Sequence, residues 1–398
     1  MAIYLDNNAT TPVDPAVLQA MLPYFTEQFG NASSSHAFGE NVAEAIRGAR
    51  RAVAALIGAA HESEIVFTSG GTESDNAVLR SALVTQDGRD EIVTTRVEHP
   101  AILALCVHLQ EIGAARVHMI DVDRAGRLDE QAFAQALGPR TALASVMWAN
   151  NETGTLFPIA RLAAMAKEAG ALFHSDCVQA AGKVPVDAAE SGVDFLSFSA
   201  HKFNGPKGVG ALYVKKGVKF SPLLRGGKQE RGRRGGTENA PGIVGMGRAA
   251  ELALARLDEE QVRVKMLRDR LEHGLMAHIE RAMVLGDLAH RLPNTLDIAF
   301  ECVDSEAVLH QLTREGVAAS SGSACASGSM EPSHVLRAMN VPPLYLQGAV
   351  RFSLSRANTE FEIDKVASLM TQIVADVRAK SPLWRERASE AAAMEAQA

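Results

Sequence analysis

The sequence has few of the features that mark several large classes of protein. It contains no run of about 18 apolar residues, so no membrane span is expected. Residues 1–6 lack both a basic start and an apolar segment, so no signal peptide is expected. The 40 Lys and Arg residues against 47 Asp and Glu give a net charge of −7, which provides no general attraction for nucleic acid or an anionic membrane.

Cysteine is also scarce. The chain has four cysteines, at positions 106, 177, 302 and 325, and they form no C-x-x-C pair. This spacing indicates neither a zinc site nor a disulfide framework, so no intrinsic metal is expected. Such a chain fits a reducing compartment, and we therefore expect a cytoplasmic protein.

Apolar residues make up 47% of the 398 positions, which is enough for sizeable cores, and the length suggests two domains. Short apolar segments at 64–68, 92–95, 117–120 and 142–147 alternate with helical segments at 101–112, 129–137 and 159–169. This alternation predicts a mostly parallel sheet that is covered by helices on both faces.

One lysine stands where open α/β sheets bind their ligands. Lys202 follows the predicted strand 193–198, and a lysine at the carboxyl end of a strand can form a Schiff base with a carbonyl cofactor. Asp176 follows the strand 171–173 and could keep the ring nitrogen of pyridoxal phosphate protonated. Lys207 is the rival amine, but its Gly-Pro…Gly context favours a bend.

The small residues that follow the strand 64–68 predict an anion site. Gly71 and Thr72 stand where a helix begins, so backbone N–H groups and the helix dipole would face a ligand. A helix cap would explain this loop equally well if it stood alone. Ser199 and His201, beside the candidate lysine, add hydrogen-bond donors, and the combination indicates a phosphate site.

Several long motifs carry a resemblance to a known family. The runs SAHKFNGPKGVG and HSDCVQAAGK resemble the class-V, fold-type I pyridoxal phosphate enzymes. With them stand YLDNNATTPV, FTSGGTESDN, VEHPAI, MWANNETGTLFP, RGGKQERGRRGGTEN and SSGSACASGSMEPSHVLRAM. The ordered set resembles the cysteine desulfurases, most closely those of the nitrogen-fixation (NifS) type, and extends from about residue 3 to about residue 380.

The resemblance implies an α/β fold of fold-type I. A large domain, residues 15–255, would hold a mostly parallel seven-stranded sheet between helices. A smaller α+β domain would combine residues 1–14 with 256–380. Residues 381–398 are rich in Ala and Glu and offer few anchors, so we expect a frayed tail there. The resemblance also implies a homodimer in which the loop 225–239 crosses the interface.

That loop has a second interpretation when it is considered alone. Residues 225–239 resemble an RGG-type nucleic-acid segment. Glu230 and Glu238 interrupt it, and no aromatic residue is interleaved, so no nucleic-acid partner is expected. In the family, Thr237 of this loop reaches the cofactor phosphate of the partner subunit.

The resemblance assigns further cofactor contacts. His99 would stack on the ring of pyridoxal phosphate, and Asn151 and Gln179 would form hydrogen bonds near its phenolic oxygen. Lys202 would bind the cofactor covalently and later move the α-proton of the substrate. His99 would also donate or accept a proton.

The implied reaction converts L-cysteine to L-alanine. Arg351 would bind the substrate carboxylate in a bidentate manner, with Asn31 and Asn151 nearby. Cys325 lies among small residues that cannot pin its loop, and its thiolate would take the substrate sulfur as a persulfide. The sulfur would pass to an iron–sulfur scaffold or another acceptor protein, and Cys325 could be a transient iron–sulfur ligand.

Two alternatives remain open from the sequence. A selenocysteine lyase or another β-eliminating enzyme would use the same scaffold without attack by Cys325. A non-catalytic scaffold protein in cluster assembly would not need the set of Lys202, Asp176, Arg351 and Cys325. The resemblance favours a nitrogenase-related acceptor, although housekeeping cluster assembly uses a nearly identical active site.

Overall fold

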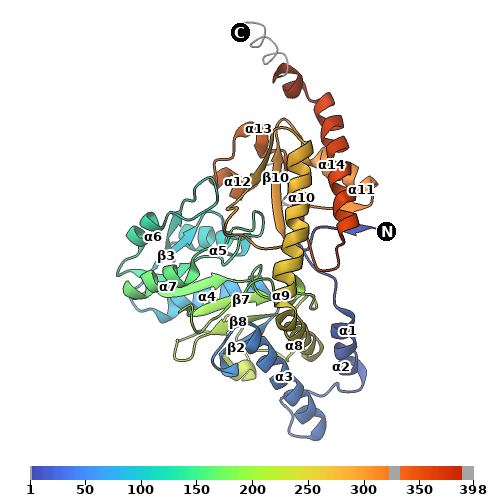
Figure 1. The fold of residues 1–398 in the computed structure, drawn as a ribbon. Helices are drawn as coiled ribbons and strands as arrows, with labels where there is room; N and C mark the ends of the chain where they lie inside the picture. Colours follow the sequence, from blue (N-terminus) through green and yellow to red (C-terminus); the bar gives the residue numbers. More distant parts are fainter. Residues whose placement is uncertain (1, 322–331, 388–398) are drawn as a thin grey trace.

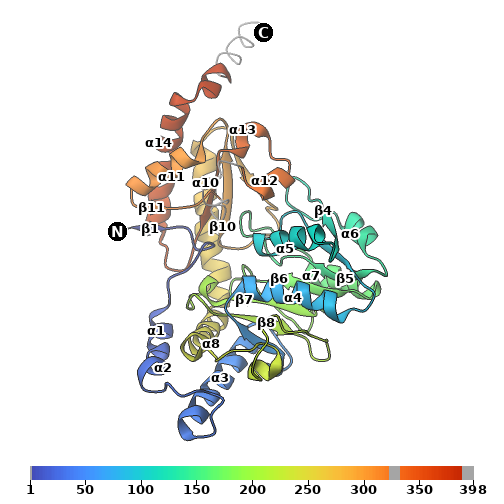
Figure 2. The same ribbon diagram turned by 180° about the vertical axis from the view of Figure 1, so that it is seen from behind.

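The computed structural model describes residues 2–321 and 332–387 (Figures 1 and 2). A seven-stranded sheet in the order β2-β8-β7-β6-β5-β3-β4 dominates one part of the chain. Its strands are β2 (Ile65–Thr68), β3 (Glu91–Thr95), β4 (Arg116–Ile120), β5 (Thr141–Ser145), β6 (Leu172–Asp176), β7 (Phe195–Ser199) and β8 (Gly210–Val214). Within this sheet only β8 runs antiparallel to its neighbours, so the predicted mostly parallel sheet is confirmed.

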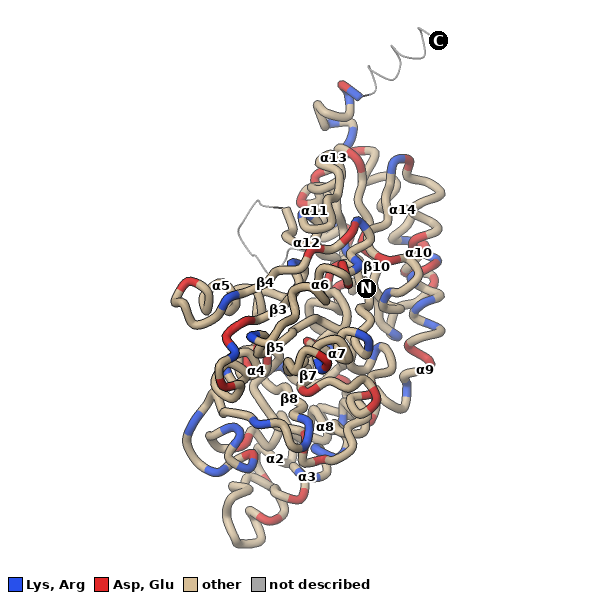
Figure 3. Tube along the Cα trace, turned by 90° about the vertical axis from the view of Figure 1, so that its left-hand side faces the viewer, with Lys and Arg blue, Asp and Glu red and all other residues tan. Residues whose placement is uncertain are grey.

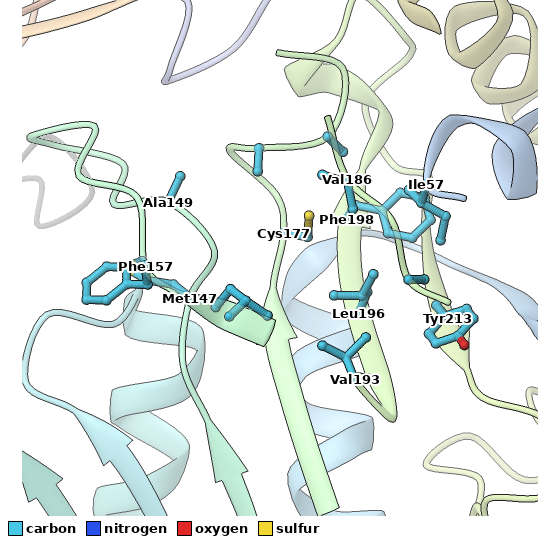
Figure 4. Close-up of a cluster of buried hydrophobic side chains, with 14 of the residues drawn as sticks. Ile57, Met147, Ala149, Phe157, Cys177, Val186, Val193, Leu196, Phe198 and Tyr213 are labelled. Atoms are coloured by element: carbon cyan, nitrogen blue, oxygen red, sulfur yellow. The ribbon is translucent and has the colours of Figure 1, made fainter. Parts of the chain in front are cut away.

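Helices cover both faces of this sheet, as Figure 1 shows. On one face lie α4 (Gly71–Thr85) and α5 (Pro100–Glu111); on the other lie α3 (Ala37–Leu56), α7 (Ile159–Glu168) and α8 (Ala240–Ala255). Strand β7 is buried along its whole length because successive side chains enter opposite cores. Phe195 packs with the α4 side, whereas Leu196 and Phe198 pack on the other side with Cys177 (Figure 4).

A second unit has its own sheet and core. The strands β9 (Ala282–Leu285), β10 (Thr295–Phe300) and β12 (Ala349–Ser353) form an antiparallel sheet in the order β12-β10-β9. The helices α10 (Lys265–His278), α11 (Ser305–Arg314) and α14 (Glu360–Lys380) pack around it. The N-terminal strand β1 (Ile3–Tyr4) pairs in parallel with β11 (Val317–Ala318), so the start of the chain joins this unit.

Short helices complete the fold. They are α1 (Pro15–Met21), α2 (Pro23–Thr26), α6 (Glu130–Ala136), α9 (Leu257–Glu259), α12 (His334–Ala338) and α13 (Pro343–Leu346). A π-helical turn, Glu260–Val264, lies between α9 and α10, and this helical run connects the two units (Figure 1). The boundaries of the two domains at residues 14/15 and 255/256 stay predictions.

The segment beyond α14 makes tertiary contacts. The ring of Trp384 lies 4.1 Å from the guanidinium carbon of Arg378 and 5.6 Å from that of Arg281. Arg387 forms an ion pair of 3.0 Å with Glu301. Trp384 and Arg387 therefore contact the second unit, although they belong to the predicted frayed tail, and residues 388–398 lie outside the described residues. Within the part of the chain that the structure describes, no helix is both long and apolar enough to cross a membrane.

A buried ion pair anchors the glycine-rich loop 225–239. The Glu230 carboxylate accepts hydrogen bonds of 2.7 Å from both Nη atoms of Arg50 and one of 3.0 Å from the backbone N–H of Phe67. Glu230 is 6% exposed, and Arg50 also donates to the Ile65 carbonyl. Elsewhere acidic and basic residues are spread over both units of the chain (Figure 3).

We expect Glu230→Gln to lower the free energy of unfolding by about 3–5 kcal/mol, because the Arg50 charge would stay buried without its counter-charge. Urea unfolding followed by circular dichroism measures this change. The matched control is Glu44→Gln, which removes exposed ion pairs with Arg47 and Arg51 and should leave the free energy of unfolding nearly unchanged. Equal effects of the two substitutions would contradict the structural role of Glu230.

Candidate active site

A cavity of about 260 Å³ lies where β6 and β7 end. The short 3-10 turn Ala200–Lys202 continues from β7 and closes one side of it. The lining residues are Ala9, Gly71, Thr72, Asp75, His99, Met147, Ala149, Asn151, Asp176, Val178, Gln179, Ser199, His201 and Lys202. The cavity thus collects every predicted cofactor residue except Thr237, which is exposed and lies outside the lining.

The lining contains one lysine. Lys202 Nζ donates to the backbone carbonyl oxygens of Asn8 at 2.6 Å and Ala9 at 2.9 Å. These contacts hold the amine at the cavity wall. Lys207, the rival from the sequence, is exposed and does not line the cavity, so geometry favours Lys202 as the reactive amine.

Asp176 lies at the end of β6 and is 5% exposed. One carboxylate oxygen accepts a hydrogen bond of 2.9 Å from the backbone N–H of Val178. Burial raises the pKa of Asp176, and the charges of His99 and Lys202 act in the opposite direction. A cationic ring nitrogen beside this carboxylate would further stabilise its ionised form.

Sequence reasoning missed a buried polar cluster behind Asp176. Burial, and next the charge of Asp176, raise the pKa of Asp75 well above its ordinary value. His174 lies 3.6 Å from Asp75, and its ring nitrogens lie 2.9 Å from the hydroxyl oxygens of Ser145 and Ser197. Burial lowers the pKa of His174 to about 3, so its ring is neutral.

We assign the negative charge of this pair to Asp176 and the proton to Asp75, because Asp176 is the carboxyl that faces His99 and Lys202. The polar residues His174 and Ser197 inside buried strands were the sequence signal for this cluster. Such residues need hydrogen-bond partners when no water reaches them.

The N-terminus of α4 faces the cavity without a capping side chain. Gly70 is the N-cap residue, and no side chain of the described residues accepts from the first-turn N–H groups of this 15-residue helix. A Cβ atom on Gly71 would come within 2.7 Å of Val178 Cγ2, so a larger residue would not fit there. Ser199 Oγ lies nearby, 3.8 Å from where a Cβ of Gly70 would stand. Free N–H groups beside a hydroxyl form a suitable anion site.

Two histidines of the lining are neutral at pH 7. His99 Nδ1 accepts a hydrogen bond of 3.1 Å from Ala101 N–H, so the neutral ring carries its proton on Nε2. Burial lowers the pKa of His99 and lowers that of His201 to about 4. His201 Nδ1 lies 3.1 Å from Thr10 Oγ1, which fixes the ring at the cavity edge.

The residues predicted to bind the substrate do not all line this cavity. Arg351 on β12 is 4% exposed, pairs with Asp6 at 2.8 Å and donates to the Asn151 carbonyl at 3.0 Å. It therefore contacts a lining residue without lining the cavity itself. Asn31 is exposed and accepts from the Ser33 N–H, also away from the lining. Cys325 lies outside the described residues.

Comparison with known proteins supports this geometry. The family model for class-V aminotransferases matches residues 3–366. The chain belongs to the class-V aminotransferase family. A cysteine desulfurase of Gluconacetobacter diazotrophicus is 61% identical over 383 residues, which cover 96% of each chain. The cysteine desulfurase NifS of Azotobacter vinelandii is 56% identical over 382 residues, covering 96% of this chain and 95% of that one.

Solved structures agree with this class-V aminotransferase fold. A NifS-like protein matches with a TM-score of 0.88 at 38% identity, covering 94% of this chain and 100% of that one. The structure of SspA in complex with cysteine matches with a TM-score of 0.78 at 32% identity, covering 88% of this chain and 98% of that one.

Class-V aminotransferases are pyridoxal phosphate enzymes, and the residues of this cavity fit that cofactor. Lys202 offers an amine for its carbonyl group, Asp176 a carboxylate for its ring nitrogen, and the α4 N-terminus donors for its phosphate. When it is bound, the cofactor supplies an electron-accepting ring to an amino-acid substrate. The chain is thus a cofactor-dependent enzyme.

A buried carboxyl group, that of Asp297, lies beside Arg351. Asp297 on β10 is the cross-strand partner of Arg351 and is 1% exposed, and neither of its carboxyl oxygens has a hydrogen-bond partner among the described residues. Burial, with a contribution from Glu152, raises the pKa of Asp297 to about 8, whereas Arg351 lowers it. The group is therefore uncharged at neutral pH.

We expect Asp297→Asn to flatten the pH dependence of stability. Between the ordinary Asp pKa near 4 and about 8, the folded wild type holds a proton that the unfolded chain releases, so stability falls as pH rises. The Asp297→Asn variant does not lose stability in this way. Its free energy of unfolding relative to that of the wild type should therefore rise by up to about 1.4 kcal/mol per pH unit from pH 5 to 8.

Urea unfolding at each pH tests this expectation, with the exposed Asp87→Asn as the control. A constant difference between Asp297→Asn and the wild type across this range would mean that Asp297 titrates normally.

Proposed function

We propose that this class-V aminotransferase relative is a cysteine desulfurase that converts L-cysteine to L-alanine and holds the sulfur on Cys325. The observation that carries the proposal is the single cavity in which Lys202 stands with Asp176 at the ends of adjacent parallel strands. Relatives named cysteine desulfurase, at 56–61% identity over nearly the whole chain, support the substrate and the reaction.

Lys202 is the base proposed for the α-carbon, because it is the one lysine of the lining. Asp176, ionised and buried, favours a protonated ring nitrogen on the cofactor. Gly71, Thr72 and Ser199 would hold the phosphate. The Nε2–H of neutral His99 is available as a proton donor.

The substrate carboxylate is proposed to meet Arg351, with Asn151 and Asn31 nearby. Arg351 Nε is buried and has no hydrogen-bond partner among the described residues. A buried donor without a partner is costly, and a carboxylate would satisfy it. Binding there would require a shift of Asp6, which now shares this guanidinium.

The sulfur step is assigned to Cys325 on sequence grounds. Its thiolate attacks the substrate sulfur, an S–S bond forms and the C–S bond breaks. The pair of electrons from the broken bond stays with the substrate carbon, which then takes up a proton to give alanine. The other cysteines are buried, and burial raises the thiol pKa of Cys106 to about 12, so they are poor nucleophiles.

The proposal extends to the partners and the location of the protein. Five exposed apolar side chains follow one another along α1, α2, the loop after α2 and the start of α3: Leu18, Leu22, Phe25, Phe29 and Phe38, the last two with ring centroids 5.7 Å apart. Such a patch favours a protein contact, and we propose that it belongs to a homodimer in which Thr237 completes the partner's phosphate site. The proposed acceptor is an iron–sulfur scaffold in the cytoplasm, related to nitrogenase, as the NifS relative suggests.

Lys202→Ala should abolish alanine formation and remove the visible absorbance of bound pyridoxal phosphate, because no other lysine lines the cavity. Lys207→Ala is the matched control and should keep both. Turnover in Lys202→Ala, with its loss in Lys207→Ala, would reverse the assignment of the amine.

Cys325→Ala should bind cofactor and cysteine but form no alanine, since truncating a nucleophile removes the covalent step. In the wild type, mass spectrometry after brief exposure to cysteine should find one extra sulfur on Cys325 per subunit. The Cys106→Ala control should still gain it. Full alanine production by Cys325→Ala would favour simple β-elimination instead.

A further inference from the structure

A second lysine lies behind the cavity wall. Lys183 follows β6 by one turn-rich segment and is 7% exposed. Its Nζ donates to Gln179 Oε1 at 2.7 Å and to Asn8 Oδ1 at 3.0 Å. No carboxylate of residues 2–321 and 332–387 lies within ion-pair distance of this amine, so its hydrogen bonds are with amides, and the charge of Glu260 acts on it from farther away.

Asn8 connects this lysine to the reactive one. The Asn8 carbonyl oxygen accepts from Gln179 Nε2 at 2.9 Å and from Lys202 Nζ at 2.6 Å. The Asn8 side chain also accepts from Asn294 Nδ2 at 3.0 Å, which belongs to the second unit. Lys183, Gln179 and Asn8 therefore form a closed ring of hydrogen bonds, and Lys202 is attached to the same carbonyl.

This ring determines which way the Gln179 carboxamide points. An ammonium group can only donate, so it requires the oxygen of Gln179 on its side. The flipped amide would place its NH₂ group against Lys183 and its oxygen against the Asn8 carbonyl, and both hydrogen bonds would be lost. One Nε2 hydrogen is used by Asn8, and the other belongs to a side chain that lines the cavity.

We propose that Lys183 is a positioning residue: it fixes the Gln179 carboxamide so that Nε2–H, and not the oxygen, faces the ionised ring oxygen of the cofactor. The inference rests on the proposed binding of pyridoxal phosphate in this cavity. Burial, and next the charge of Lys202, lower the pKa of Lys183 to about 7. The ring of hydrogen bonds among Lys183, Gln179 and Asn8 is most stable while this amine is protonated.

The test is a double-mutant cycle on the affinity of the apoenzyme for pyridoxal phosphate. Lys183→Met and Gln179→Leu should each weaken binding about tenfold, and the double variant should be no weaker than Gln179→Leu by more than about twofold. The visible band of bound cofactor should change form at a higher pH in Lys183→Met, because the ionised ring oxygen loses a donor. Lys216→Met, at an exposed lysine, is the control and should match the wild type.

Other outcomes have distinct meanings. Additive losses of about a hundredfold in the double variant, or wild-type affinity and an unshifted band in Lys183→Met, would overturn the positioning role. If Lys183→Met does not fold, Gln179→Glu is the deciding variant. It keeps an acceptor for Lys183 but presents an oxygen to the cavity. Wild-type affinity of this variant for pyridoxal phosphate would overturn the inference. A wild type that does not bind pyridoxal phosphate would instead refute the proposed function.

Discussion

Parallel pairing of β6 with β7 is the constraint on which the rest of the site depends. The register sets Asp176 opposite Ser197, two residues before the end of β7, and the 3-10 turn that follows carries Lys202. Both strands end at the same edge of the sheet, so a carboxylate and an amine that lie 26 positions apart in the sequence share one cavity. Helices on both faces keep this edge rigid, because the strands are buried on each side.

Burial then decides the charge of each group at that edge. Three carboxyls, Asp75, Glu98 and Asp176, are almost completely buried, and burial raises the pKa of each. Of these three carboxyls, only Asp176 faces the ammonium group of Lys202, so it is the one that can stay ionised. A site built in this way can stabilise a positive ring nitrogen while the surrounding carboxyls and imidazoles stay neutral.

The N-terminal turn joins the two units of the chain. Asn8 makes contacts with Gln179 and Lys202 beside the large sheet and with Thr295 of β10. Asp6, two residues earlier, pairs with Arg351 on β12. A movement of one unit against the other would therefore change the hydrogen bonds of Lys202 and the ion pair of Arg351 together. This arrangement couples the two sides of the site through a short polar segment.

The sequence by itself determined the parallel sheet, the family and the residues at strand ends, because strand ends and glycine-rich turns are local patterns. Lys202, Asp176 and Gly71 could be assigned from such patterns. Only the tertiary structure decided the partners of Asp75, Asn8, Lys183 and Asp297, whose roles depend on residues far away in the chain. It also gave β8 its antiparallel direction and left Arg351 and Asn31 outside the cavity lining. The physical reason is that burial and hydrogen-bond geometry arise from long-range packing, which no short stretch of sequence specifies.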